Sequence, residues 1–268
     1  MQSNSKSINK SKSKNKRLEI IYKIFDTLCS SPTIIALFTF ISCYIVAINI
    51  KVWYVLLIPI VYIISSYQRI IFEILLMIHV IKHFQGKWIW WHKITPNIYL
   101  GSIPMKFLNH SNILKDELGI NHVISLNEDY EMVATTMIGS VIMTEEWKLK
   151  NIQHSIFLTA DFQPPSFDIL NKASLLLHNS ITNKKQIIYI HCKSGMGRSV
   201  SVVIAYLINY YKKDNMTVDQ AYQYIKNIRP QIFSKRSKQL INLRNYQNQI
   251  NQEKEYINNQ QKEEIIPI

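Results

Sequence analysis

The segment IIYIHCKSGMGRSVSVVIAYL, residues 187–207, restricts the fold more than any other part of the sequence. One apolar run ends at His191, a short loop with two glycines follows, and a second apolar run begins at Arg198. This order predicts a buried strand, a loop and a helix. The loop would lie at the amino end of the helix, where unpaired backbone N–H groups and the helix dipole bind anions.

Cys192 directly follows the predicted strand, inside this anion-binding loop. Gly195 and Gly197 allow the backbone to turn its amides inward without Cβ clashes. Arg198 adds a planar fork that suits two phosphate oxygens. A cysteine in such surroundings has a lowered pKa, roughly 3.5–7.5, and its thiolate can attack the phosphorus of a phosphomonoester. The alternative interpretation is a buried apolar cysteine beside an unrelated arginine.

Strand-like and helix-like runs alternate from about residue 94 onward, which predicts an α/β domain with a mostly parallel central sheet flanked by helices. The expected strands cover 97–101, 121–126, 154–160 and 186–191, and the expected helices cover 106–118, 165–182, 198–212 and 217–228. We expect the catalytic domain to span 94–246. Residues 247–268 are rich in Asn and Gln and are predicted to be a frayed helix running into a polar tail.

Residues 32–67 contain a single charged residue, Lys51. The first half of this segment is long enough to cross a bilayer, which takes about 20 apolar residues, and the second half is marginal. The segment predicts a hydrophobic helical hairpin that spans or dips into a membrane, with soluble core helices as the alternative. We expect 1–31 to be a disordered basic tail with a lead-in helix. We expect 68–93 to be an interfacial segment whose Trp-rich end forms an aromatic belt.

The formal net charge of +13 favours anionic partners, namely acidic lipid surfaces, phosphorylated substrates or nucleic acid. Much of the excess lies in the predicted tail and no nucleic-acid motif is present, so no nucleic-acid partner is expected. The three cysteines, Cys29, Cys43 and Cys192, form neither a disulfide framework nor metal-ligand spacing. A reducing compartment follows, with no metal and no cofactor.

The stretch HCKSGMGRS, 191–199, resembles the HC-x5-R-S/T signature of the cysteine-based protein tyrosine phosphatase superfamily, dual-specificity type. The resemblance implies that Cys192 is the nucleophile, that Arg198 binds the transition-state oxygens and that Ser199 donates to the sulfur. It implies that His191 orients the loop and lowers the thiol pKa. The substrate phosphate would be bound by Lys193, Ser194, Gly195, Met196, Gly197 and Arg198.

This chemistry also needs an acid for the leaving alkoxide and a base for the attacking water. Asp161 in LTADFQPPSFD lies just past a predicted strand, on a loop stiffened by prolines, at about the place where small dual-specificity members carry their acid. An Asp in a turn or helix cap is the simpler alternative. Asp168 competes for the role, but it falls inside the next predicted helix, so Asp161 is preferred.

The order of further segments resembles one branch, the mitochondrial PTP-like phosphatidylglycerophosphate phosphatases. The acidic NEDYEM segment, 127–132, and Lys193 after the cysteine are similar to that branch. A mitochondrial membrane is implied by this resemblance alone. Met196 departs from the pattern, because lipid phosphatases of this kind often carry a second cation near this position.

The sequence therefore predicts a membrane-anchored phosphatase that works through a phosphocysteine intermediate on a phospholipid phosphate such as phosphatidylglycerophosphate. Its predicted partners are this phosphorylated lipid and an anionic membrane surface. The alternative is a dual-specificity protein phosphatase for phosphotyrosine, phosphoserine and phosphothreonine. A catalytically silent phosphate-binding scaffold is a third possibility from a different class.

Overall fold

The computed structural model describes residues 32–50, 57–132, 136–211 and 216–263. The chain divides into two compact units, Met1–Met77 with Thr135–Gly139, and Ile78–Ala134 with Ser140–Ile268. The second unit contains the sheet and the predicted site residues and is called the catalytic unit below. The predicted disordered tail and lead-in helix, 1–31, lie outside the described residues.

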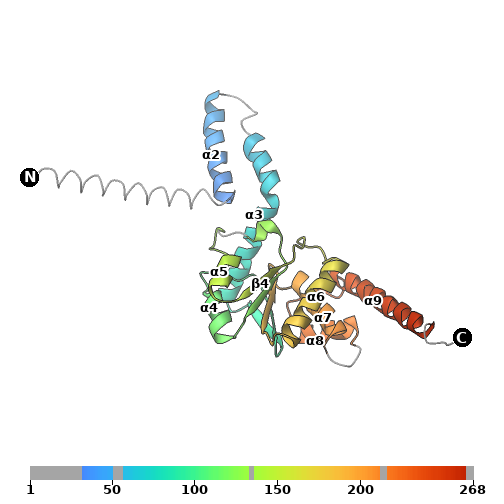
Figure 1. Cartoon of the computed structure of the whole chain (residues 1–268). Coiled ribbons are helices and arrows are strands. Elements are labelled where there is room, and N and C mark those ends of the chain that lie inside the picture. Colours follow the sequence, from blue (N-terminus) through green and yellow to red (C-terminus); the bar gives the residue numbers. More distant parts are fainter. Residues whose placement is uncertain (1–31, 51–56, 133–135, 212–215, 264–268) are drawn as a thin grey trace, which may run out of the picture. The chain divides into compact units, whose positions relative to one another are not determined.

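A five-stranded mixed sheet forms the centre of the catalytic unit (Figure 1). The strands are β1 Trp91–Thr95, β2 Ile98–Gly101, β3 His122–Ser125, β4 Gln153–Ile156 and β5 Ile188–His191, in the order β1-β2-β5-β3-β4. Only β1 pairs antiparallel with its neighbour. The predicted α/β class with helices flanking a sheet is confirmed, whereas β1 is absent from the prediction and makes the sheet mixed.

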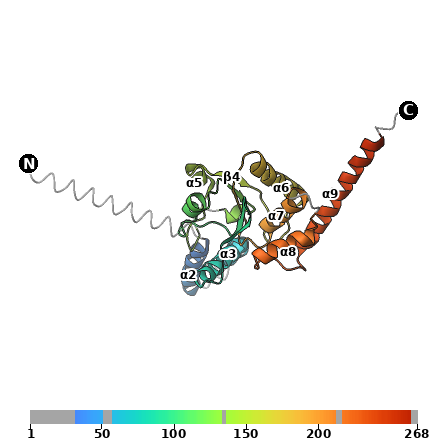
Figure 2. The same ribbon diagram turned by 90° about the horizontal axis from the view of Figure 1, so that it is seen from below.

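Helices cover both faces of this sheet (Figures 1 and 2). On one side are α6 Phe167–Thr182, α7 Arg198–Asn209 and α8 Val218–Ile228, and on the other are α4 His110–Asn112, η2 Ile113–Glu117 and α5 Thr144–Leu149. The larger core joins β5 to α7, whose residues are buried from Arg198 to Leu207. A smaller core surrounds Trp147 on the α5 side. Coverage on both faces explains why β5 is a continuous apolar run.

The C-terminal segment, predicted to be a frayed helix running into a polar tail, is helical over most of its described length. Helix α9 runs without a break over Lys238–Glu263, so most of 247–268 is helical. Leu240, Leu243 and Tyr246 anchor its first turns in the larger core. From residue 251 to 257 its side chains are exposed. Gln, Lys and Glu favour helix even where nothing packs against them, which explains the extension.

Two helices occupy the segment predicted to be a membrane hairpin, α2 Pro32–Ile50 and α3 Leu57–Phe84. The connection, 51–56, lies outside the described residues. Among the described residues, no helix has the length and apolarity to cross a membrane. Helix α3 continues without a break into the segment predicted to be interfacial, 68–93.

Helix α3 ends at Phe84, and Gly86 just after it adopts a φ of 69°. The amide of Gly86 donates to the carbonyl of His83 over 2.9 Å, and the amide of Lys87 donates to the carbonyl of Lys82 over 2.8 Å. This pair of bonds is a Schellman motif, in which a glycine takes the left-handed conformation and satisfies the last helix carbonyls. The motif turns the chain toward β1.

The predicted aromatic belt is corrected by the structure, because two of its tryptophans are buried in the catalytic unit. Trp88 and Trp90 expose only 7% and 2% of their surface. The indole of Trp88 donates to Ser102 Oγ over 3.2 Å, and that of Trp90 donates to the carbonyl of Ile103 over 3.0 Å. Clustered tryptophans are equally suited to a bilayer interface and to a core that offers hydrogen-bond acceptors. Here Trp88 and Trp90 are part of the core.

Candidate active site

The loop after β5 has the geometry of an anion cradle, because its carbonyl groups are bonded outward. The carbonyl of Lys193 accepts from the amide of Ile103 over 3.1 Å, and that of Met196 accepts from the amide of Phe233 over 3.0 Å. The carbonyl of Ser194 accepts from Ser102 Oγ over 2.9 Å. Successive carbonyls held outside leave the N–H groups of the loop facing inward, toward a bound anion.

The fully buried guanidinium group of Arg229 holds this loop in place through hydrogen bonds. Its Nε donates to the carbonyl of Gly195 over 2.9 Å, and its Nη2 donates to that of Ser194 over 3.1 Å. Burial, partly offset by Tyr189 and Cys192, lowers the pKa of Arg229 to about 10. The group is thus charged at neutral pH and adds positive potential beneath the loop.

Cys192 lies at the base of the loop and is 2% exposed. Burial acts to raise the pKa of its thiol, but the charge of Arg198 and hydrogen bonds from the side chain and amide of Ser199 outweigh it. The net result is a lowered pKa. The hydroxyl of Ser199 donates to Cys192 Sγ over 3.4 Å. These contacts favour the thiolate, the reactive form of a cysteine.

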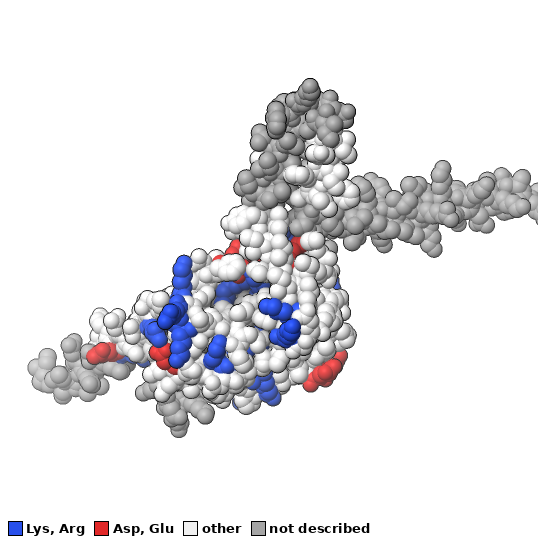
Figure 3. Space-filling view, turned by 180° about the vertical axis from the view of Figure 1, so that it is seen from behind, with Lys and Arg blue, Asp and Glu red and all other residues white. Residues whose placement is uncertain are grey.

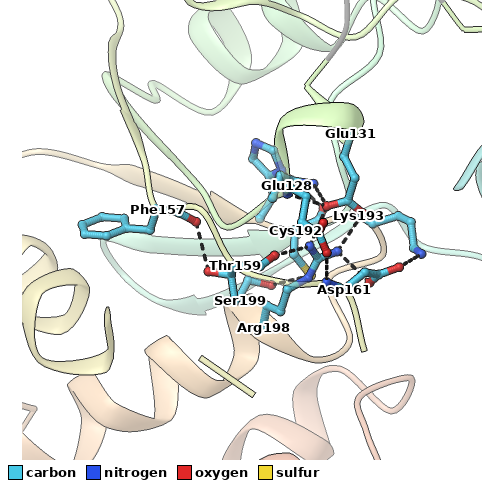
Figure 4. Close-up of polar contacts among 11 residues, drawn as sticks. Glu128, Glu131, Phe157, Thr159, Asp161, Cys192, Lys193, Arg198 and Ser199 are labelled. Atoms are coloured by element: carbon cyan, nitrogen blue, oxygen red, sulfur yellow. Dashed lines mark hydrogen bonds and ion pairs between the residues drawn. The ribbon is translucent and has the colours of Figure 1, made fainter. Parts of the chain in front are cut away.

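Arg198 is held by a buried carboxylate, Glu131 (Figure 4). Its two terminal nitrogens meet the two carboxylate oxygens at 2.5 and 2.9 Å. Nη1 also donates to the carbonyl of Thr159 over 3.0 Å. Burial acts to lower the pKa of Arg198, but the hydrogen bonds to Glu131 outweigh it, so the pKa is raised. Glu131 is in turn bound by the side chain of Asn127 and the amide of Glu128.

Asp161 lies beside the same arginine, on the loop after β4. Its carboxylate is 2.9 Å from Arg198 Nη2 and forms a second ion pair with Lys193. The carboxylate of Glu128 accepts from the amide of Asp161. Lys193 is 4% exposed, and its ammonium lies 4.6 Å from the centre of the Phe162 ring. The lysine is thus an inner residue of the site and not a solvent-facing one at its rim.

A chain of hydrogen bonds links His191 to neighbouring strands. The carbonyl of Cys192 can only accept, so Nδ1 of His191, 3.3 Å away, carries the proton. Nε2 of His191 therefore accepts from Ser125 Oγ at 2.7 Å, and Ser125 Oγ accepts from Nε2 of His154 at 2.8 Å. Nδ1 of His154 then accepts from Thr144 Oγ1 at 2.8 Å. Burial lowers the pKa of His191 to about 3 and that of His154 to about 4, which keeps both rings neutral.

The structure brings most of the predicted site residues together. Around the thiol are Arg198, Ser199, Asp161 and Lys193, whereas Asp168 pairs with Lys172 on the exposed surface of α6. Sequence reasoning assigned no role to Glu128, Glu131, Ser125, His154 and Arg229. The NEDYEM segment contained the signal for two of them. Within the described ranges, no cluster of His, Cys, Asp and Glu could hold a metal ion.

A thiolate-stabilising loop between a central strand and a buried helix, with an arginine on its rim, defines the cysteine-based phosphatases. The family model for the dual specificity phosphatase catalytic domain matches residues 98–249, more than half of the chain. The chain therefore belongs to this family, and the predicted superfamily is confirmed.

Among curated proteins, the chain is similar to phosphatidylglycerophosphate phosphatase PTPMT1 of Arabidopsis thaliana, with 34% identity over 61% of this chain and 45% of that protein. PTPMT2 of the same plant is 31% identical over 61% of this chain and 66% of that protein. Human phosphatidylglycerophosphatase and protein-tyrosine phosphatase 1 is 33% identical over 46% and 58%. The chain thus spans less than two thirds of each relative. A solved structure of PTPMT1 in complex with PI(5)P has a TM-score of 0.52 and 27% identity over 62% of this chain and 99% of that one.

Proposed function

We propose that this protein is a cysteine-dependent phosphatase that hydrolyses a phospholipid phosphate such as phosphatidylglycerophosphate. The observation that carries the proposal is the Cys192 thiol, whose pKa is lowered inside a loop of inward-facing amides and beside Arg198. The relatives named as phosphatidylglycerophosphate phosphatases support a lipid phosphate as substrate. Basic side chains outnumber acidic ones on the face seen in Figure 3, which suits an anionic substrate at an anionic surface.

The chemistry proceeds in two displacements at phosphorus. The Cys192 thiolate attacks, a P–S bond forms, the P–O bond to the lipid alcohol breaks, and Asp161 gives its proton to the leaving alkoxide. Water then attacks the phosphocysteine while Asp161 takes a proton, and the P–S bond breaks to return the thiolate and phosphate. Ser199 donates to the departing sulfur.

Asp161 has to move for this cycle to start. Its carboxylate is paired with Arg198 and Lys193, which are the cations that a phosphate would use. A phosphomonoester that binds the loop displaces Asp161 from Arg198. The freed carboxyl is then next to the departing oxygen, where a protonated acid is needed.

The test compares turnover by the full chain on phosphatidylglycerophosphate vesicles with turnover on phosphotyrosine and phosphothreonine peptides. We expect lipid hydrolysis to be preferred and to vanish in Cys192→Ser. A preference for peptides by orders of magnitude would replace the lipid proposal with the protein phosphatase alternative, an activity that the name of the human relative also includes. Equal turnover with and without the thiol would rule out both.

We also infer that the N-terminal segment attaches the protein to a membrane, and the resemblance to mitochondrial phosphatases supports a mitochondrial one. Support comes from α2, in which Leu37, Phe38 and Tyr44 expose about 60% of their surface (60%, 61% and 59%). Flotation of the full chain with liposomes should weaken in the double variant Phe38→Asp, Ile41→Asp. Unchanged flotation of this variant would contradict attachment through α2.

A further inference from the structure

A second pocket, away from the phosphate loop, is built from aromatic side chains of the catalytic unit. It has a volume of 470 Å³ and is lined by His83, Gly86, Trp88, Ile89, Trp90, Trp91, Leu108, His110 and Ile113. The ring of Trp90 packs against His83 and His110 at 5.3 and 4.9 Å between centroids. The ring of Trp91 meets His110 edge-on at 5.0 Å. The phosphatase chemistry described above uses none of these side chains.

The polar atoms of these aromatic residues are largely engaged within the protein. The two indoles of Trp88 and Trp90 donate to Ser102 Oγ and to the carbonyl of Ile103. Nδ1 of His83 donates to the carbonyl of Trp88, and Nδ1 of His110 accepts from the amide of Met105. Burial lowers the pKa of His110 to about 3, so this ring is neutral. The pocket therefore offers mainly carbon surfaces and suits an apolar ligand.

The exposed side chains around the pocket indicate that this apolar ligand comes from a membrane. Phe84 and Phe107, each next in sequence to a lining residue, are 70% and 46% exposed, and the lining residue Ile89 is 57% exposed. The segment 78–93 that supplies most of the lining carries three lysines and no acidic residue. Exposed aromatic and aliphatic side chains flanked by lysines match the boundary between anionic headgroups and acyl chains.

We propose that this pocket takes up an acyl chain of an anionic membrane lipid and so docks the catalytic unit on the bilayer that contains its substrate. The proposal rests on the proposed lipid phosphatase function for its biological setting. It explains why the chain buries tryptophans beside exposed phenylalanines at this edge of the sheet. Unlike attachment through α2, it places the bilayer against the catalytic unit itself.

The pocket is also joined to the phosphate loop by two short chains of hydrogen bonds. Trp88 donates to Ser102 Oγ, whose hydroxyl donates to the carbonyl of Ser194. The carbonyl of Ile89 accepts from Arg229 Nη1 at 3.3 Å, and Arg229 Nε donates to the carbonyl of Gly195. An acyl chain that enters the pocket therefore contacts residues that are two hydrogen bonds from the phosphate loop.

The test uses tryptophan quenching by vesicles of phosphatidylcholine and phosphatidylglycerol whose acyl chains carry bromine. The full chain with Trp53→Phe retains three tryptophans at the pocket and Trp147 in the core. We expect strong quenching. Ile89→Asp should lower pocket occupancy about tenfold or more, because the isoleucine side chain would no longer be there to be buried against the acyl chain. Ile241→Asp on α9 is the matched control, because Ile241 is 54% exposed, and should change nothing.

Leu108→Phe separates a filled pocket from mere contact with the bilayer, because it narrows the cavity without adding charge. We expect it to reduce quenching, with thermal unfolding confirming that the variant is folded. Quenching that is absent, or equal in Ile89→Asp and Ile241→Asp, overturns the proposal, as does full quenching in Leu108→Phe. Phosphatidylglycerol carries no phosphomonoester, so these outcomes do not depend on catalysis. Failure of the proposed function would appear separately, as no hydrolysis of phosphatidylglycerophosphate.

Discussion

Gly195 and Gly197 lie two positions apart in the phosphate loop but face different surroundings. Gly195 has a φ of 64°, and a Cβ there would overlap the carbonyl group of Gly101 and approach Arg229. A Cβ on Gly197 would meet only the side chain of Gln239, at 3.5 Å. Gly195 is thus required by the close approach of two backbones, whereas Gly197 has space.

Gly195→Ala is therefore expected to destabilise the fold by about 1–3 kcal/mol and to abolish most turnover, because the loop must shift away from β2. Gly197→Ala is expected to stay within about 1 kcal/mol of the parent. Denaturant unfolding and kcat/KM on an aryl phosphate measure both effects. Equal losses in the two variants would show that the contact with Gly101 is not the reason.

Glu131 supplies negative charge that balances Arg198, and neither side chain is more than 3% exposed. Replacing it by glutamine breaks this buried ion pair and leaves Asp161 as the remaining carboxylate beside the guanidinium; breaking a buried pair typically costs about 3–5 kcal/mol. Glu131→Gln should therefore unfold at a much lower denaturant concentration and lose kcat/KM. Asp168→Asn, which removes an exposed ion pair with Lys172, is the control and should change little. A stable, active Glu131→Gln protein would contradict this account.

At the scale of elements, three neighbouring strands share the chain of bonds that ends at Cys192. Ser125 of β3 lies between His154 of β4 and His191 of β5 and is paired in register with His191. A serine hydroxyl can donate to one ring and accept from the other through a single oxygen atom. The strand order β5-β3-β4 thus brings one residue of each strand into a single chain of hydrogen bonds, in which the position of each proton is defined.

Ser125→Ala removes both bonds, and each buried group left unpaired costs about 1–3 kcal/mol. We also expect the pKa of Cys192 to rise, because His191 no longer holds the Cys192 carbonyl in place. The rate of thiol alkylation against pH measures this pKa, and its midpoint should move upward. Ser180→Ala is the control, since Ser180 bonds to His122 at 3.2 Å and not to His191. It should lower stability without moving the midpoint.

The contrast between predicted and unpredicted residues follows from sequence separation. Cys192, Arg198 and Ser199 lie within one strand–loop–helix unit, so their spacing specifies their geometry. Glu131, Ser125 and Arg229 meet this unit from 34 to 67 residues away, and their contacts depend on a strand order that periodicity does not encode. Strand β1 is absent from the prediction for another reason: Trp91 at its start, and Trp88 and Trp90 before it, fit a membrane interface as well as a core.

At the scale of the whole molecule, burial keeps most of the histidines neutral. Of eight histidines, six have a lowered pKa, to about 3 or about 4. They are His79, His92, His110, His122, His154 and His191. Such residues accept protons only when the protein unfolds, so the unfolded chain binds more protons below pH 6.5.

The free energy of unfolding should therefore fall as the pH drops from about 6.5 toward 4, because unfolding takes up protons in this window. Each histidine lowers the free energy of unfolding by roughly 1.4 kcal/mol per pH unit over the range in which it is protonated only in the unfolded state. Denaturant titrations at pH 7, 6, 5 and 4 measure the slope. His154→Gln should reduce it by about one proton, and a slope that this change leaves untouched would contradict the assignment.

The hydrogen bonds that hold the carbonyls of the phosphate loop also make the reactivity of Cys192 a measure of folding. The loop carbonyls are held from the segment after β2, from Arg229 at the end of α8 and from Phe233. A reactive thiolate thus exists only while all these segments are assembled. The alkylation rate of Cys192 therefore measures the cooperativity of unfolding. It should drop in a single step that coincides with global unfolding, and not in several steps as individual strands separate.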